Sequence, residues 1–361
     1  MEKIVFFINK LYGGGAERVT VALANEFCQQ MNYEVHLLVY SRNKEYEYPV
    51  SEKIIIHSYD EEQIATNRIR SLIDRTIYLI KKIKEIDPCC VVSLGSPKEI
   101  TLLTFAAKFN RKKLILSERN DPKNFPQSKS LRFIRLIEYS ISDEVVFQTK
   151  GAKEFFSGKI QNKSKVISNP LNNQIPERCT KSRKKVIVNW CRLAPQKNLD
   201  LLIDAFSKVV KKHPQYKLEI YGEGPEKEPL EKKIIKMGLS EKVFLKGYCN
   251  NIYDKVIDAA IFVSSSDYEG ISNSMLEAIA MGIPSICTDC PAGGARETIK
   301  NGINGILVPV RDEKKLVEAM ERLIEDQDLA RKISDEGIKL KDDLNIVSIS
   351  KQWDYFINNI L

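Results

Sequence analysis

Short apolar runs alternate with stretches of helical spacing along the whole chain. In the first half, the runs that predict strands are residues 4–8, 35–40, 54–57, 91–94, 114–117, 145–149 and 166–167. Apolar residues at helical spacing separate these runs, for example over 16–31 and 69–86. Alternating strands and helices favour an α/β fold with a parallel, doubly wound sheet.

A second set of strands follows a turn-rich segment. Its predicted strands are residues 186–189, 218–221, 243–245, 261–263, 285–287 and 305–308. Between the two sets, residues 169–173 and the polar run to Lys185 have the composition of a domain boundary. The pattern predicts two Rossmann-like domains, 1–168 and 169–348, which face a central cleft. In such folds, ligands bind at the carboxyl ends of the strands.

The composition describes an ordinary globular protein. A chain of 361 residues with 43% hydrophobic and 29% charged residues is long enough for two domains with separate cores. No apolar run is long enough to span a bilayer, and the N-terminus enters a strand without a signal-peptide pattern. We therefore expect a cytoplasmic protein.

The cysteines and histidines do not predict a metal site. Cys287 and Cys290 form a C-x-x-C pair without a second pair at zinc-binding spacing, so buried, reduced thiols are expected. The three histidines, His36, His57 and His213, are scattered over two strands and a helix end and form no recognisable ligand set.

Two carboxylates eight positions apart, Glu269 and Glu277, carry the strongest chemical signal. The run 260–263 predicts a buried strand, and Ser272 or Asn273 can cap a helix that extends to about Met281. Free backbone N–H groups at a helix N-terminus suit an anion such as a diphosphate. A flanking carboxylate can accept hydrogen bonds from sugar hydroxyls. The alternative is a capped surface helix.

Two further segments have residues suited to phosphate binding. Residues 189–200 place Arg192 and Lys197 just after a predicted strand, and Gly13, Gly14 and Gly15 precede a predicted helix. Neither segment is a nucleotide motif of the common kinds. The glycines fail the G-x-G-x-x-G dinucleotide pattern at its last position, and no Gly-Lys-Ser/Thr follows them. A structural turn remains the alternative for the glycines.

In this order, the three segments resemble those of the retaining, nucleotide-sugar-dependent glycosyltransferases, which have the two-domain GT-B fold. Within these enzymes, the chain is similar to glycosyltransferase family 4. The resemblance extends over nearly the whole chain. It implies that the terminal helix, 349–361, crosses back onto the first domain. It also implies an E-x7-E pair that binds the donor sugar nucleotide, which differs from the acid–base pair of a glycosidase.

The resemblance implies a role for each motif residue. Arg192 and Lys197 would bind the donor diphosphate, with Gly270, Ile271 and Ser272 contributing N–H groups, and Glu269 would contact the transferred sugar. Glu277 would accept hydrogen bonds from the ribose hydroxyls, and Tyr248 and Cys249 would contact the base. Gly14 and Gly15 would approach the diphosphate or the acceptor. The chain departs from the family's pattern at Cys191 and at Ile271. It also lacks the histidine that many relatives have after the fourth or fifth strand. Glu118 and Arg119 are the candidates to line the reaction centre in place of that histidine, and a plain capping loop is the alternative.

The basic charge is concentrated in the first domain. Residues 1–168 carry 27 Lys and Arg against 20 Asp and Glu, whereas residues 169–361 carry 29 against 28. Within the segment 67–135 the counts are 16 and 6. An uneven basic surface predicts an anionic partner, although a solvated helix surface is the alternative.

The basic segment also contains apolar residues at helical spacing. In the first segment, the apolar residues are Ile69, Leu72, Ile73, Ile77 and Ile80, and the basic residues are Arg68, Arg70, Arg75, Lys81, Lys82 and Lys84. In the second segment, the apolar residues are Leu131, Ile134 and Ile137, and the basic residues are Arg132 and Arg135. We expect much of each apolar side to cover the domain core. The basic residues outside could rest on anionic headgroups, which predicts peripheral, salt-releasable association with the inner face of the membrane.

These observations lead to one main prediction. The chain is expected to move a hexose or N-acetylhexosamine from a UDP-sugar to a saccharide acceptor, lipid-linked or oligosaccharide, in polysaccharide or glycan synthesis. We expect no metal cofactor, because no Asp-x-Asp triplet is positioned to hold one and cations serve the diphosphate, and no nucleic-acid partner. The alternatives are a nucleotide-cofactor oxidoreductase, which the missing glycine pattern disfavours, and a non-catalytic sugar-nucleotide binder.

Overall fold

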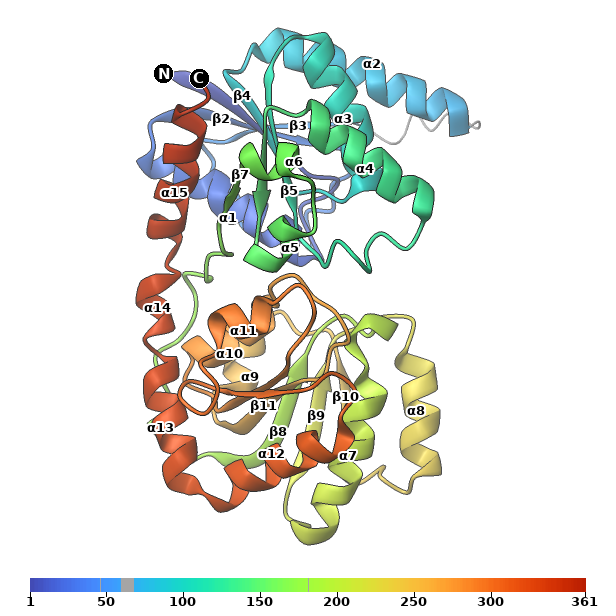
Figure 1. Ribbon diagram of the computed structural model, residues 1–361, viewed down its shortest axis with the longest axis vertical. Helices are drawn as coiled ribbons and strands as arrows, with labels where there is room; N and C mark the ends of the chain where they lie inside the picture. The colour runs from blue at the N-terminus through green and yellow to red at the C-terminus, as the bar shows by residue number, and fades with distance from the viewer. Residues whose placement is uncertain (46, 60–67, 181) are drawn as a thin grey trace. The chain divides into compact units, whose positions relative to one another are not determined.

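A computed structural model describes residues 1–45, 47–59, 68–180 and 182–361. The chain forms two compact units, the first made of residues 1–170 with 345–361 and the second of residues 171–344. Each unit consists of one parallel sheet with helices against it (Figure 1). The predicted fold class, two Rossmann-like doubly wound units, is confirmed.

Unit 1 contains a seven-stranded parallel sheet in the order β3-β2-β1-β4-β5-β6-β7. Its strands are β1 (Glu2–Phe7), β2 (Tyr33–Val39), β3 (Ile55–Ser58), β4 (Cys90–Ser93), β5 (Lys113–Glu118), β6 (Glu144–Phe147) and β7 (Ser164–Val166). Every apolar run expected to form a strand in this half does so. The strand order reverses between β1 and β4, where the carboxyl edge of a doubly wound sheet binds ligands.

The helices of unit 1 fall into two groups. They are α1 (Gly15–Gln30), α2 (Arg68–Ile86), α3 (Pro97–Phe109), α4 (Lys129–Ile141), α5 (Lys150–Glu154), α6 (Gly158–Asn162) and α15 (Ile346–Asn358). Helix α15 packs beside α1, while α2, α3 and α4 lie next to one another (Figure 1). The hydroxyl of Tyr33 donates to Asp354 of α15 at 3.0 Å, and Trp353 is buried. The C-terminal helix therefore belongs to unit 1.

Unit 2 contains a six-stranded parallel sheet in the order β10-β9-β8-β11-β12-β13. Its strands are β8 (Lys184–Trp190), β9 (Lys217–Tyr221), β10 (Val243–Gly247), β11 (Ala259–Ser264), β12 (Ser285–Thr288) and β13 (Ile306–Val308). Its helices are α7 (Leu199–Lys212), α8 (Lys227–Lys236), α9 (Ile252–Val256), α10 (Asn273–Ala280), α11 (Gly294–Thr298), α12 (Glu313–Glu325), α13 (Gln327–Gly337) and α14 (Leu340–Asp343). The strand order reverses between β8 and β11, so the loops that follow these two strands lie at the ligand-binding edge.

Two expectations about the basic segment are wrong. The apolar residues Ile69, Leu72, Ile73 and Ile77 do not cover the core, because each is at least 44% exposed. Helix α2 instead packs Leu79, Ile83 and Ile86 on the sheet.

The second wrong expectation concerns Arg135, which does not lie on the outer surface. It is 1% exposed, because it shares the inward side of α4 with Glu138 and Tyr139. Asn67, at the start of the basic segment, lies outside the described residues.

The cysteines are reduced, as expected, and the histidines are less scattered than expected. Cys287 and Cys290 are buried and unbridged. His36 and His57 come together on neighbouring strands, with 2.9 Å between Nδ1 and Nε2. Across the described ranges, no three His, Cys, Asp or Glu residues gather in a way that could hold a metal ion. None of the helices in the described part of the chain is both long and apolar enough to cross a membrane.

Candidate functional site

The loop after β8 is held by its own apolar residues and by an unusual cap. Leu193 and Ala194 are buried, and the short 3-10 turn η2 (Pro195–Lys197) follows them. Asn198 then takes a left-handed conformation at φ 43° and caps α7, because its side chain accepts from the N–H of Leu201 at 3.3 Å. The loop that carries Lys197 is therefore fixed at both ends.

Two glycines let the next loop pack directly against the first. Both have positive φ, 136° for Gly222 and 157° for Gly224. A Cβ at Gly222 would lie 1.9 Å from the carbonyl oxygen of Cys191, and one at Gly224 would lie 2.2 Å from that of Leu193. The turn after β9 therefore has a packing role, since only glycine fits at these two positions.

The loop after β11 is hydrogen-bonded to the loop after β8. The hydroxyl of Ser265 donates to the carbonyls of Lys197 and Asn198 at 3.0 and 2.9 Å. The side-chain amide of Gln196 donates to the carbonyl of Tyr268 at 2.8 Å. These bonds bring together two segments that are about 70 residues apart in the sequence.

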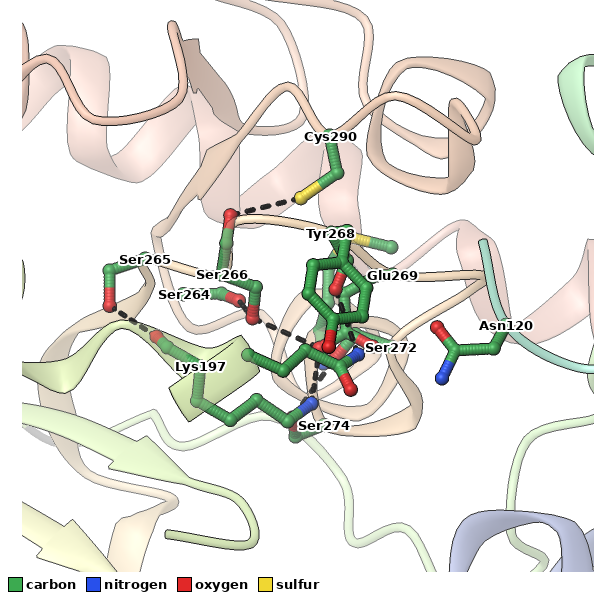
Figure 2. A network of polar contacts seen from close by, with 12 residues as sticks. Asn120, Lys197, Ser264, Ser265, Ser266, Tyr268, Glu269, Ser272, Ser274 and Cys290 are labelled. Carbon is green, nitrogen blue, oxygen red and sulfur yellow. Dashed lines mark hydrogen bonds and ion pairs between the residues drawn. The ribbon is translucent and has the colours of Figure 1, made fainter. Parts of the chain in front are cut away.

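Lys197 and Glu269 form an ion pair at this junction. The Nζ of Lys197 donates to Oε1 of Glu269, and both side chains turn toward each other in Figure 2. Ser266 donates to the same oxygen at 2.9 Å, and Gln196 donates to Oε2 at 3.1 Å. The two side chains remain 19% and 15% exposed, so solvent reaches the pair.

The pair keeps Lys197 protonated. Burial alone would lower the pKa of the Lys197 ammonium, but the charge of Glu269 outweighs it and raises that pKa above its ordinary value. The site therefore carries a fixed cation at neutral pH, next to a carboxylate that already accepts three hydrogen bonds.

Helix α10 begins at Asn273, a short turn after Glu269. Ser272 is the N-cap, and its hydroxyl accepts from the N–H of Met275. The preceding Gly270 packs against α11, since a Cβ on Gly294 would lie 1.9 Å from the Gly270 carbonyl oxygen. Ile271 is buried beside it. The N-terminus of α10 thus follows Glu269 closely in the chain, which is the position that the predicted anion site needs.

Glu277 lies deeper than Glu269. It is 3% exposed, and its carboxylate accepts from Nε1 of Trp190 at 3.1 Å. The Trp190 ring packs edge-on against Phe262 of β11. The sequence predicted Glu277 in the helix but did not identify Trp190 as its partner, because nothing in the spacing joins a strand end to a helix 87 residues later.

The remaining predicted residues of unit 2 are more open. Arg192 is exposed, and it makes no hydrogen bond or ion pair to any residue within the described ranges. Tyr248 is exposed and Cys249 half-buried in the loop after β10. The structure therefore joins Lys197 to Glu269, and among the described residues it shows no hydrogen bond or ion pair from Arg192, Tyr248 or Cys249 to that pair.

In unit 1, the glycine turn before α1 has an acidic neighbour. Gly13 has a positive φ of 83°, whereas Gly14 is extended and is the N-cap of α1, which begins at Gly15. The carboxylate of Glu17 lies so close to Gly14 that a Cβ there would be 1.9 Å from Oε2. A carboxylate at this helix N-terminus favours hydroxyl donors over a diphosphate.

Glu118 lies inside unit 1. Its Oε2 accepts from Arg135 at 2.9 Å and from the hydroxyl of Tyr139 at 3.3 Å, while Oε1 accepts from the N–H of Arg119. Arg135 also donates to the carbonyls of Pro122 and Phe125. Burial raises the pKa of Glu118, and the charge of Arg135 opposes that rise without cancelling it.

Arg119 has a partly buried guanidinium. It donates to the side chains of Ser117 and Asn169, and Gln148 donates to the same Asn169 oxygen at 2.6 Å. The side chains of Glu118 and Arg119 therefore belong to separate hydrogen-bond groups, although the backbone N–H of Arg119 donates to Glu118. Of the two, only Arg119 reaches partial solvent exposure.

Comparison with known proteins gives related sugar transferases over most of the chain. Residues 172–340 match the family described as glycosyl transferases group 1. An uncharacterized glycosyltransferase of Haemophilus influenzae is 26% identical over 358 residues, covering 98% of this chain and 99% of that protein. A Campylobacter jejuni N-acetylgalactosamine-N,N'-diacetylbacillosaminyl-diphospho-undecaprenol 4-alpha-N-acetylgalactosaminyltransferase is 29% identical over 351 residues, covering 92% of each. The crystal structure of Anabaena HepE in complex with UDP and glucose shares the fold, with a TM-score of 0.84 at 17% identity over 99% of this chain and 100% of that one.

Proposed function

We propose that this chain, which is similar to the glycosyl transferases of group 1 over residues 172–340, is a retaining glycosyltransferase that moves a hexose or N-acetylhexosamine from a UDP-sugar to a lipid-linked saccharide in the synthesis of a surface polysaccharide or glycan. The observation that carries this proposal is the Lys197–Glu269 pair at the N-terminus of α10. A cation, a carboxylate and a helix N-terminus close to one another suit a sugar diphosphate better than a neutral ligand.

The donor diphosphate exchanges partners with the ion pair. Phosphate oxygens take the ammonium of Lys197, with the exposed Arg192 and the N–H groups of Gly270, Ile271 and Ser272 around them. Glu269 is then free to accept hydrogen bonds from the hydroxyls of the transferred sugar. When the bond from the anomeric carbon to the phosphate oxygen breaks, fixed cations stabilise the charge that develops on UDP.

The nucleoside of the donor is bound by other residues of unit 2. Glu277, oriented by Trp190, accepts from the ribose hydroxyls. The loop of Tyr248 and Cys249 contacts the base.

The reaction proceeds without a metal ion. Lys197 has its pKa raised by Glu269, so it stays charged at the pH of the cell and can balance the diphosphate. Activity should therefore survive excess EDTA. A requirement for added Mg²⁺ or Mn²⁺ would contradict this part of the proposal.

The acceptor is a lipid-linked saccharide at the inner face of the membrane. The related Campylobacter jejuni enzyme is named for a diphospho-undecaprenol acceptor, and the basic excess of this chain lies in residues 1–168. In unit 1, the Glu17 carboxylate beside Gly14 suits an acceptor hydroxyl, and Arg119, directly after β5, is partly exposed.

A donor screen with a matched acceptor screen tests the proposal. Radiolabelled UDP-hexoses and UDP-N-acetylhexosamines are incubated with lipid-linked saccharides, and the anomeric configuration of the product is read by NMR. A thermal-shift series with UDP and with NAD accompanies the screen. The expected result is stabilisation by UDP alone and a product with the donor's α configuration. Stabilisation by NAD alone, or a product of inverted configuration, would overturn the assignment.

A further inference from the structure

Helix α3 of unit 1 turns two phenylalanines toward solvent. The helix buries Ile100, Leu103 and Ala107, and the opposite side carries Phe105 and Phe109. These two side chains are 56% and 65% exposed, and their rings lie 6.1 Å apart. They contribute little to the core, because the core-facing positions of the helix are already filled.

Helix α4 repeats this arrangement. Arg135 and Tyr139 point inward, while Phe133, Ile137 and Ile141 follow one another at intervals of four residues on the outward side. Phe133 is 65% exposed. Single exposed apolar residues are common in soluble proteins, but consecutive outward turns of a helix filled by them are not.

The two helices present their apolar sides together. Thr101 of α3 donates to Glu138 of α4 at 2.5 Å, and the helices are neighbours in the same layer (Figure 1). The apolar face is defined here by Phe105, Phe109, Phe133, Leu136, Ile137 and Ile141, each at least 41% exposed. Helix α2 lies against α3 and adds the exposed Ile77.

Exposed basic side chains lie on the same three helices as the apolar face, and we call them its basic rim. Among the described side chains of α2, α3 and α4, the exposed charged ones are Arg70, Lys81, Lys84, Lys98, Lys129 and Glu85. The one carboxylate of this set, Glu85, is paired with Lys82 at 2.8 Å, and the half-buried Asp74 is a further acidic group on α2. The surface therefore combines aromatic and branched aliphatic side chains with a basic rim.

We propose that the apolar face of α3 and α4 inserts into the interfacial region of an anionic bilayer, with the basic rim on the headgroups. The inference rests on the proposed membrane association and deepens it, because contact by apolar insertion differs from electrostatic docking alone. A layer of helices that carries exposed apolar residues and lysines matches the headgroup–acyl boundary. Charge complementarity favours anionic lipid over a second copy of this chain, since two such faces would bring basic rims together.

Vesicle binding by the full-length chain tests the proposal. Vesicles of phosphatidylcholine with and without phosphatidylglycerol are floated with the wild type at low and high salt. The double variant Phe109→Ser/Phe133→Ser should bind anionic vesicles about tenfold or more weakly at both salt concentrations. The double variant Lys98→Gln/Lys129→Gln should lose affinity at low salt only, because salt screens the charges. Ile235→Ser, at an exposed isoleucine of α8 in unit 2, is the matched control and should bind as the wild type does.

A fluorescence measurement reports insertion directly. Phe133→Trp should show blue-shifted emission with anionic vesicles and quenching by brominated acyl chains, whereas Ile235→Trp should show neither. Equal vesicle binding by the phenylalanine double variant and the wild type would overturn the proposal. A dimer in solution that the same double variant dissociates would also overturn it. Stabilisation by UDP, measured on the same samples, separates the outcomes: if UDP binds while vesicles do not, only the membrane proposals fail.

Discussion

Two pairs of opposite charge differ in how they are surrounded. In unit 2, Lys197 and Glu269 are 19% and 15% exposed, and the carboxylate is held by side-chain donors. In unit 1, Arg135 and Glu118 are 1% and 3% exposed, and the guanidinium also donates to two backbone carbonyls. The first pair can exchange a partner for a ligand. The second has no route to one and fixes the loop after β5 instead.

This difference shows why a strand-end glutamate is an ambiguous signal. Glu118 ends β5, and Glu269 follows β11 by five residues. The sequence predicted both as site residues. What separates them is the identity of their donors, which only the packing of distant helices and loops decides. We expect substitutions at the buried pair to change stability and substitutions at the open pair to change activity.

Arg135→Ala should have the largest effect. It leaves Glu118 buried without its cation and frees the carbonyls of Pro122 and Phe125, so the free energy of unfolding should fall by about 3–5 kcal/mol. Urea denaturation at pH 7 measures the loss. Arg132→Ala, one turn earlier on α4, is the control and should cost less than about 1 kcal/mol. Equal losses of unfolding free energy in the two variants would show that the buried pair contributes no more to stability than Arg132 does.

Lys197→Ala should instead abolish most activity while the fold stays intact. Removal of a fixed cation from the leaving-group site should lower kcat/KM by about 10²–10³-fold. The control is Lys232→Ala, which breaks an exposed ion pair with Glu228 on α8 and should leave kcat/KM unchanged. Steady-state kinetics with the donor found in the screen decides the matter. Activity close to that of the wild type would remove Lys197 from the donor site.

Trp190→Phe should have a smaller and more specific effect. It removes the hydrogen bond that orients Glu277, so the Kd for UDP should rise by about tenfold. Trp353→Phe, at the buried tryptophan of α15 in unit 1, is the matched control. Isothermal titration calorimetry should show unchanged UDP affinity in that control. Similar affinities for both variants would mean that Glu277 does not contact the nucleotide.

The smallest effect concerns Glu138, next to the buried pair. Burial raises the pKa of Glu138 from 4.5 to about 7, so between these values the folded chain holds a proton that the unfolded chain releases. Stability should therefore fall as the pH rises from 4.5 to 7 and stay level above it. Glu138→Gln should remove this slope and add about 1 kcal/mol at pH 8, after allowance for solvent screening. Urea denaturation from pH 5 to pH 8 measures it, with the exposed Glu154→Gln as control; a slope that survives in Glu138→Gln would contradict the assignment.

The sequence predicted the strands well because buried parallel strands are short, continuous apolar runs. It also predicted Lys197 and Glu269 as site residues, since both follow strands at the ligand-binding edge. Their mutual ion pair could not be predicted, because it depends on hydrogen bonds between two loops. Arg135 was misplaced for a related reason. A charged residue within an amphipathic pattern is expected outside unless its partner, here Glu118, is known.

The apolar face shows a second limit of sequence patterns. Helical spacing predicts which residues share one side of a helix, but it does not say whether anything covers that side. Ile69 and Ile77 on α2 were expected to cover the core, and their exposure emerges only from the placement of the helix on the sheet. The position of Leu79 and Ile83, which take the core-facing side, decides the outcome.

Titration of UDP into the full-length chain tests the donor site most directly. Isothermal titration calorimetry is run on the wild type, on Lys197→Met and on Lys232→Met. The wild type and Lys232→Met should bind one UDP with the same affinity, whereas Lys197→Met should bind it at least about tenfold more weakly, because a charge-assisted contact to the diphosphate is lost. Equal UDP affinity in all three proteins would contradict the placement of the diphosphate at the Lys197–Glu269 pair.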